Sequence, residues 1–115
     1  MPIIYKICPE TLWREAERDG VFRGTADDLR DGFVHFSTAA QLAETVRKHY
    51  AGQDGLLLIA LDSDSLGPAL TWEPSRGRSE LFPHLYGELP LTAVERVEPL
   101  PRGDGGRHVI PDLPG

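Results

Sequence analysis

The order of apolar and polar positions along the chain predicts strands interleaved with helices. Residues 3–8 are rich in apolar and β-branched side chains and predict an opening strand. Pro9 suits the first turn of a helix, because its missing N–H would be unpaired there. Apolar residues then recur at helical spacing, at Leu12, Trp13 and Ala16. We expect this helix to end at Gly20, and residues 25–31 to form a capped turn or a one-turn helix.

The strongest helical pattern follows residues 33–36, which predict a short buried strand. Thr38 and Gln41 have the spacing of a capping box, in which each side chain satisfies a free backbone donor of the other residue. Apolar residues continue at helical offsets, at Ala39, Leu42, Ala43, Val46 and Tyr50. We expect Gly52 to close this helix.

The second half of the chain predicts further strands. Residues 56–61 are continuously apolar and too few for a helix, so they predict a central strand covered on both faces. Two shorter segments also predict strands, namely 70–73 and 91–97. Residues 75–88 follow neither period and predict a long loop, which in a compact domain is more often functional than idle. In the Pro/Gly-rich tail 99–115, only residues 107–110 are suited to a sheet edge.

These elements indicate an α+β fold in a single domain spanning residues 1–115, with a mixed, mainly antiparallel sheet and two main helices. A chain of 115 residues buries roughly two-thirds of its unfolded surface, so it needs no disulfide or metal to fold. No apolar run approaches the roughly 20 residues of a membrane span, and the start resembles no secretory signal. We therefore expect a cytoplasmic protein without membrane contact. The single cysteine, Cys8, is expected to be buried.

The charge balance argues against general nucleic-acid binding. The formal net charge is -6, from 18 acidic and 12 basic residues, whereas phosphate backbones are bound by clustered Lys and Arg. A local positive site at Arg76 and Arg78 is compatible with this balance. The glycine-rich loops of P-loop and dinucleotide-binding proteins and the Gly-x-Ser-x-Gly elbow are missing from the sequence.

His35 is the first candidate for chemistry, because it lies within an otherwise apolar predicted strand. Alternation places it on the same strand face as Phe33 and Ser37. Ser37, Thr38 and the free amides of the following helix would suit an anionic group. The alternative is a buried histidine bonded to a backbone carbonyl, beside ordinary capping residues.

A second cluster, Arg76, Arg78, Ser79 and Glu80, lies in the predicted loop. A planar guanidinium binds phosphate or carboxylate in a bidentate manner, and Glu80 could act as acid, base or ribose-hydroxyl acceptor. The alternative is structural, with Glu80 and Glu73 pairing with the arginines to hold the loop.

His84 and Tyr86 follow in the same loop and could polarise, stack on or hydrogen-bond a ligand. The alternative is that Phe82, Leu85 and Tyr86 pack beneath the loop as core. His35 and His84 could share a zinc ion with a carboxylate, but two isolated histidines form no recognised ligand spacing. We therefore expect no metal.

Two stretches carry a family resemblance: Gly-Phe-Val-His-Phe-Ser-Thr at 32–38 and Arg-Gly-Arg-Ser-Glu-Leu-Phe-Pro-His-Leu-Tyr-Gly at 76–87. They resemble the signatures of small bacterial proteins grouped as domain of unknown function 952, and the likeness runs from about Tyr5 to Val97. That family is similar in fold to the ADP-ribosyltransferases, whose mixed sheets bind NAD in a cleft. The His-Phe-Ser stretch is similar to the histidine-bearing strand of the RNA 2′-phosphotransferase branch.

The resemblance implies that His35 contacts the nicotinamide ribose or the transferred group, that Ser37 supports it, and that Arg76 or Arg78 faces phosphate. NAD is the cofactor implied, and His35 and Glu80 are the candidate catalytic residues. The transferase arginine–serine–glutamate arrangement draws on separate strands, so the contiguous residues 78–80 do not reproduce it.

Three functions are compatible with the sequence. The first is a pocket for NAD or another ADP-ribosyl or phosphate-bearing small ligand, with ADP-ribosyl or 2′-phosphate transferase chemistry. The second is a non-enzymatic binder of a small anionic metabolite. The third is a protein-interaction module in which Phe82 and Tyr86 are the anchors.

Overall fold

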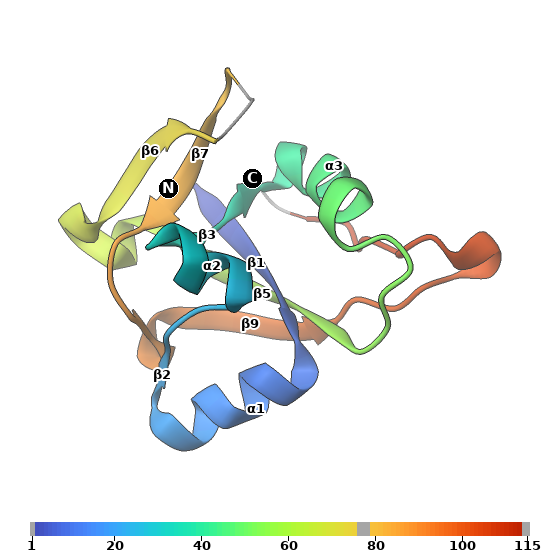
Figure 1. Ribbon diagram of the computed structural model, residues 1–115, viewed down its shortest axis with the longest axis horizontal. Coiled ribbons are helices and arrows are strands. Elements are labelled where there is room, and N and C mark those ends of the chain that lie inside the picture. Colours follow the sequence, from blue (N-terminus) through green and yellow to red (C-terminus); the bar gives the residue numbers. More distant parts are fainter. Residues whose placement is uncertain (1, 76–78, 114–115) are drawn as a thin grey trace.

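The computed structural model describes residues 2–75 and 79–113. The helices are α1 (Glu10–Asp19), α2 (Ala26–Asp31) and α3 (Ala39–His49). The strands are β1 (Ile3–Pro9), β2 (Val21–Phe22), β3 (Val34–His35), β4 (Ser37–Thr38), β5 (Leu56–Asp62), β6 (Leu70–Pro74), β7 (Leu81–Leu85), β8 (Leu89–Pro90) and β9 (Val94–Pro99). In Figure 1, α1 lies at the opposite end of the molecule from the β6–β7 hairpin.

A four-stranded sheet in the order β4-β1-β5-β9 forms the centre of the fold. Its strand β5 is buried along almost its whole length, which confirms the strand predicted at 56–61. Alternate side chains of β5 enter two separate apolar clusters. One cluster includes Trp13 of α1, and the other includes Leu42 and Val46 of α3. The central strand is continuously apolar because both of its faces are covered.

The caps predicted at Gly20 and at Thr38–Gln41 are confirmed, whereas the predicted closure at Gly52 is wrong, because α3 ends at His49 with Tyr50 as its C-cap. Gly20 ends α1 in the left-handed conformation, with φ 85°. Thr38 and Gln41 form the expected capping box at the start of α3. The short helix predicted over 25–31 is α2, and it begins with a second capping box between Thr25 and Asp28.

The loop predicted at 75–88 is wrong in part, because Leu81–Leu85 is strand β7. This strand pairs with β6 on one side and β3 on the other, forming a three-stranded sheet in the order β3-β7-β6. Pro83 and His84 interrupt the apolar alternation that would have predicted a strand. The strands that pair with β7 include β3, which is distant in sequence, so no local pattern predicts β7.

The single strand predicted at 33–36 is also corrected. The chain changes sheets at Phe36: β3 pairs with β7, whereas β4 pairs with β1. The last predicted strand starts later than 91, because Leu91–Ala93 forms a 3₁₀ turn. Residues 107–110 form no strand and contribute one isolated bridge, between Arg102 and His108.

The fold is therefore α+β with antiparallel sheets. Every strand pairing in the described ranges 2–75 and 79–113 is antiparallel, so the parallel component of the predicted mixed sheet does not occur there. None of the helices in these ranges is long and apolar enough to cross a membrane. Cys8 is fully buried, as predicted.

Candidate functional site

A cavity of about 830 Å³ is lined by residues of the four-stranded and the three-stranded sheet. Strand β4 pairs with β1 at Ile4 and Tyr5, and this pairing does not extend to Lys6. The cavity adjoins β1 beyond this point, and its lining comes from β1, α2, β3, β4, α3 and the β6–β7 hairpin. Its volume falls in the range of small-molecule sites, about 300–1,000 Å³.

One face of the three-stranded sheet supplies a wall of this cavity. His35 of β3 is the register partner of His84 of β7, so the two side chains lie on the same face. Alternation adds Phe33 and Tyr86 to that face. Glu73 of β6 joins them, because it lies two residues from Thr71, which is the β6 partner of His84. Strand pairing therefore gathers side chains from two distant parts of the sequence.

Asp28 lies at the base of the cavity and is 2% exposed. Its carboxylate accepts a hydrogen bond from the backbone N–H of Thr25 at 2.8 Å, as the second half of the α2 capping box. It also forms an ion pair with Lys6, whose Nζ lies 2.7 Å from Oδ2. Lys6 is itself 2% exposed, so each of these charges neutralises the other in a buried position.

The ionised form of Asp28 is favoured despite its burial. Burial by itself raises the pKa of this carboxyl, but the hydrogen bond from His35 and the charge of Lys6 act in the opposite direction and prevail. The net result is a pKa well below the ordinary range of an aspartic acid. The base of the cavity therefore carries a fixed carboxylate.

His35 is held between two carboxylates. Its Nδ1 lies 2.6 Å from Oδ1 of Asp28, and its Nε2 lies 3.0 Å from Oδ2 of Asp31. Carboxylate oxygens only accept hydrogen bonds, so the bond to Asp28 places a hydrogen on Nδ1 of His35. The backbone-carbonyl partner considered for His35 is thus replaced by two carboxylates.

Asp31 has a second partner on the outer side of the cavity. The guanidinium of Arg30 lies 3.0 Å from Oδ1 of Asp31 and 3.2 Å from Oδ1 of Asp27. The hydrogen bond and charge of Arg30, followed by the contact with His35, lower the pKa of Asp31. Asp31 is therefore ionised, and it remains partly open to the cavity.

His84 is held differently from His35. Its Nδ1 lies 2.8 Å from Oε1 of Glu73, and its Nε2 lies 3.3 Å from the Oγ of Ser75. Burial lowers the pKa of His84, more than the bond to Glu73 raises it, so the ring is neutral near neutral pH. Hydrogen bonds from Tyr86 and His84 lower the pKa of Glu73, which is therefore an acceptor. It follows that Nδ1 carries the hydrogen and Nε2 is a free base facing Ser75.

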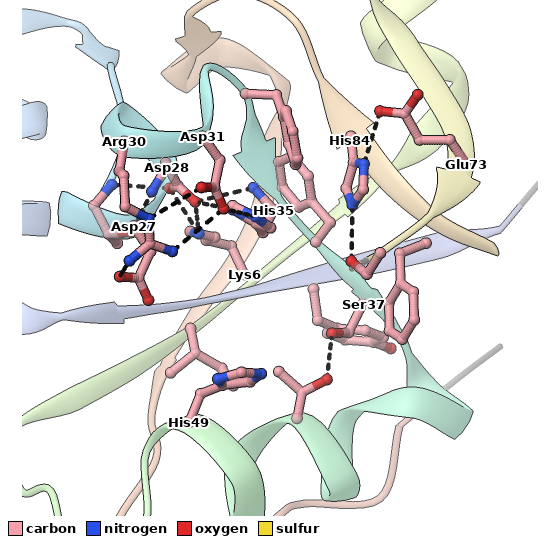
Figure 2. A pocket seen from close by; sticks show the side chains of 18 of the residues that line it. Lys6, Asp27, Asp28, Arg30, Asp31, His35, Ser37, His49, Glu73 and His84 are labelled. Atoms are coloured by element: carbon pink, nitrogen blue, oxygen red, sulfur yellow. Dashed lines mark hydrogen bonds and ion pairs between the residues drawn. The ribbon is translucent and has the colours of Figure 1, made fainter. Parts of the chain in front are cut away.

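Phe33 packs against both histidines, whose rings also contact each other edge-on at a centroid distance of 5.4 Å. Its ring stacks on His84 at a centroid distance of 4.1 Å and contacts His35 at 4.5 Å. Tyr86 closes this aromatic group at 5.2 Å from Phe33, and its hydroxyl donates to Glu73. Figure 2 shows His35 with its carboxylates on one side of the pocket, and His84 with Glu73 on the other.

The cavity carries more carboxylates than permanent cations. Among the described lining residues, the carboxylates are Asp27, Asp28, Asp31 and Glu73, and the permanent cations are Lys6 and Arg30. Both of these cations are already paired with aspartates. The described wall thus favours a ligand that brings a positive charge or hydrogen-bond donors.

The structure brings four of the predicted site residues to this cavity, namely His35, Ser37, His84 and Tyr86. Ser37 has a protein partner there, since its Oγ lies 3.1 Å from Oγ1 of Thr45. His49, the last residue of α3, also lines the cavity.

Other predicted residues lie elsewhere. Thr38 is absent from the cavity lining, and its hydroxyl accepts the backbone N–H of Gln41 in the helix cap. Ser79 and Glu80 are exposed and also absent from the lining, and Gln41 donates to Glu80 at 3.3 Å. The predictions for Arg76 and Arg78 lie outside the described residues.

The interaction-module hypothesis needs a correction at Phe82. This side chain is only 5% exposed, because it belongs to β7 and packs inward. It cannot be an exposed anchor. Tyr86 is 47% exposed, so the alternative that Phe82, Leu85 and Tyr86 pack as core holds for Phe82 and Leu85 and is wrong for Tyr86. Glu73 contacts His84 and Tyr86, and the pairing considered for it with Arg76 or Arg78 lies outside the described residues.

Sequence reasoning missed the carboxylates that position the histidines. Asp28 and Asp31 fall in a charged segment typical of a solvated helix, and Glu73 in a strand next to the predicted loop. One signal was present: Thr25 and Asp28 have capping-box spacing. Another was Lys6, a charge inside an apolar strand that needs a buried partner. Within residues 2–75 and 79–113, no three His, Cys, Asp or Glu side chains are grouped to hold a metal ion.

Comparison with known structures shows close relatives. The crystal structure of protein CC0527 from Caulobacter crescentus is 41% identical, with a TM-score of 0.87, over 93% of this chain and 93% of that one. The solution NMR structure of CC0527 is 42% identical, with a TM-score of 0.83, over 93% of this chain and 91% of that one. No curated protein matches the chain significantly.

The family comparison covers most of the same region. The model described as "Protein of unknown function (DUF952)" matches residues 7–97. This range contains the histidines and carboxylates of the cavity described above. Lys6, the cation paired with Asp28, immediately precedes it. The chain belongs to the DUF952 family.

Proposed function

We propose that the protein binds NAD or a closely related ADP-ribosyl ligand in this cavity, and that it transfers the ADP-ribosyl group. The observation that carries the proposal is the position of His35, held between Asp28 and Asp31 and beside the ring of Phe33 in an open cavity. The remote resemblance of the His-Phe-Ser stretch at 35–37 to NAD-using transferases, and of the fold to theirs, is part of the same proposal.

The carboxylates of the cavity favour binding of the nicotinamide end of NAD. The nicotinamide ring of NAD is a pyridinium cation attached to ribose, and the aromatic side chains of Phe33 and Tyr86 in the cavity lining would attract such a cation. Cleavage of the ring–ribose bond develops positive charge on the ribose. Asp31 is partly exposed to the cavity, and its carboxylate would stabilise that charge where it forms.

The phosphates of the ligand need cationic partners other than those of the described lining. Lys6 and Arg30, the permanent cations of the described lining, are already paired with aspartates. Binding of phosphate by Arg76 or Arg78 remains the prediction made from the sequence. Acceptance of a 2′-phosphorylated RNA is the less favoured form of the proposal, because the wall is rich in carboxylates.

Calorimetric titration with four ligands tests the proposal. NAD and its reduced form NADH have the same phosphates, but only NAD has the charged nicotinamide, so NAD should bind about tenfold more tightly. ADP-ribose should bind more weakly than NAD, and 2′-phosphorylated RNA measures the alternative substrate. Heat with none of the four ligands, for folded protein, would overturn the proposal.

Variants of the cavity wall add a second test. Asp31→Asn removes a carboxylate beside His35 and should reduce the preference for NAD over NADH. Asp19→Asn is the matched control, since Asp19 is an exposed carboxylate outside the cavity that pairs with Arg23. Binding of NAD without release of nicotinamide after long incubation would instead identify a non-enzymatic binder.

A further inference from the structure

The neighbourhood of Ser75 differs from that of the other hydroxyl groups in the cavity. Strand β6 ends at Pro74, and the next residue places its Oγ 3.3 Å from Nε2 of His84. The other ring nitrogen of His84 lies 2.8 Å from a carboxylate oxygen of Glu73. A hydroxyl, an imidazole and a carboxylate are therefore connected in series, and all three residues line the cavity.

The protonation states of this series suit proton abstraction from the hydroxyl. Glu73 is ionised and accepts the hydrogen of Nδ1, which leaves the lone pair of Nε2 directed at Ser75. The burial of His84, 1% exposed, keeps its ring fixed. Tyr86 holds Glu73 from the other side. A hydroxyl bonded to a base that a third group orients is the arrangement of an activated nucleophile.

We propose that Ser75 is a nucleophilic serine, activated by His84 and Glu73, and that it accepts the ribosyl group of the ligand as a site of self-modification. The inference rests on the proposed function, because the ribosyl donor is the NAD-type ligand of the same cavity. Ser37 offers no such centre, since its hydroxyl pairs with Thr45 and not with a histidine.

The step balances without an added reactant. The bond between the nicotinamide nitrogen and ribose C1′ breaks, and its electron pair neutralises the nicotinamide, which leaves. The Oγ of Ser75 forms a bond to C1′, and its proton passes to Nε2 of His84. The positive charge of the pyridinium is thereby replaced by an imidazolium, which the carboxylate of Glu73 stabilises. No group is oxidised or reduced.

Mass spectrometry after incubation with NAD tests the inference. We expect an ADP-ribosyl adduct that peptide mapping assigns to Ser75 and that Ser75→Ala removes. Glu73→Gln should slow its formation at least about tenfold, because the imidazole loses its orienting carboxylate. Ser65→Ala is the matched control and should form the adduct at the wild-type rate, since the hydroxyl of Ser65 bonds to the carbonyl of Asp62 and is absent from the cavity lining.

The pH dependence of the rate separates a base from a merely structural histidine. Adduct formation should become faster as pH rises through the pKa of His84, because only the neutral ring accepts the proton. If NAD binds in the titration but no adduct forms on Ser75, or one forms only elsewhere, the inference is overturned and the pocket proposal remains. If NAD does not bind, the proposed function fails, and this inference fails with it.

Discussion

Lys6 and Asp28 form an ion pair whose side chains are 3% and 1% exposed, with Nζ 2.7 Å from Oδ2. The pair joins the first strand to α2. It also fixes the carboxylate that orients His35, since Asp28 accepts from both the backbone N–H and Nδ1 of that residue. The same contact thus supports the fold and the candidate site.

Removing one partner of this pair should destabilise the protein strongly. Lys6→Met leaves the buried carboxylate of Asp28 without its permanent cation, and we expect a loss of about 3–5 kcal/mol in the free energy of unfolding. Urea denaturation followed by circular dichroism measures this loss. Arg30→Met removes exposed ion pairs and should cost much less. Equal losses in the two variants would show that the buried pair has no special role.

Acid should destabilise the native state through Asp28. Its pKa is lower in the folded protein than in the unfolded chain, so the unfolded chain binds more protons as pH falls. The stabilisation is complete above about pH 4 and declines below it. Thermal unfolding between about pH 5 and 2 measures this decline. The slope should be shallower in Asp28→Asn, and an equal slope in the two proteins would contradict this account.

His84 should be protonated to a smaller extent than an ordinary histidine at the same pH. Its pKa is lowered, chiefly by burial, so the native state is also destabilised as pH falls below about 6.5, where the unfolded chain takes up the proton. Nitrogen NMR of the ring at about pH 6.5 should show a protonated Nδ1 and an unprotonated Nε2. Two protonated ring nitrogens at this pH would remove the base assigned to Ser75.

Thr38 should affect stability and not ligand binding. Its hydroxyl caps α3, so Thr38→Ala should cost about 1 kcal/mol in the free energy of unfolding, whereas Thr38→Ser should preserve most of it. Urea titration of the three proteins measures the difference. Weaker NAD binding in Thr38→Ala at unchanged stability would instead support the ligand role that the sequence predicted for this residue.

Cys8 should be unreactive in the native protein. Burial raises the pKa of its thiol to about 12, so almost no thiolate is present near neutral pH. A disulfide reagent that releases a coloured thiol should react with it only after unfolding in urea, and the unfolded protein is the control. Rapid reaction in native buffer would mean that the first strand opens readily.

The local sequence pattern predicted correctly several elements whose structure depends on residues close in sequence. The apolar run at 56–61 is the buried central strand, and the Thr38–Gln41 spacing is the cap of α3. Strand β7 was not predicted, because Pro83 and His84 break its apolar alternation and because one of its partners, β3, lies far away in the sequence.

The sequence alone established His35 and His84 as candidates, because a histidine among apolar or aromatic residues is conspicuous without any fold. Only the tertiary structure placed the two on one sheet face, since register between distant strands decides which side chains meet. It also identified Asp28 and Glu73 as their partners. A carboxylate looks like a solvated surface residue in a sequence, and its burial and hydrogen bonds exist only after the chain has folded.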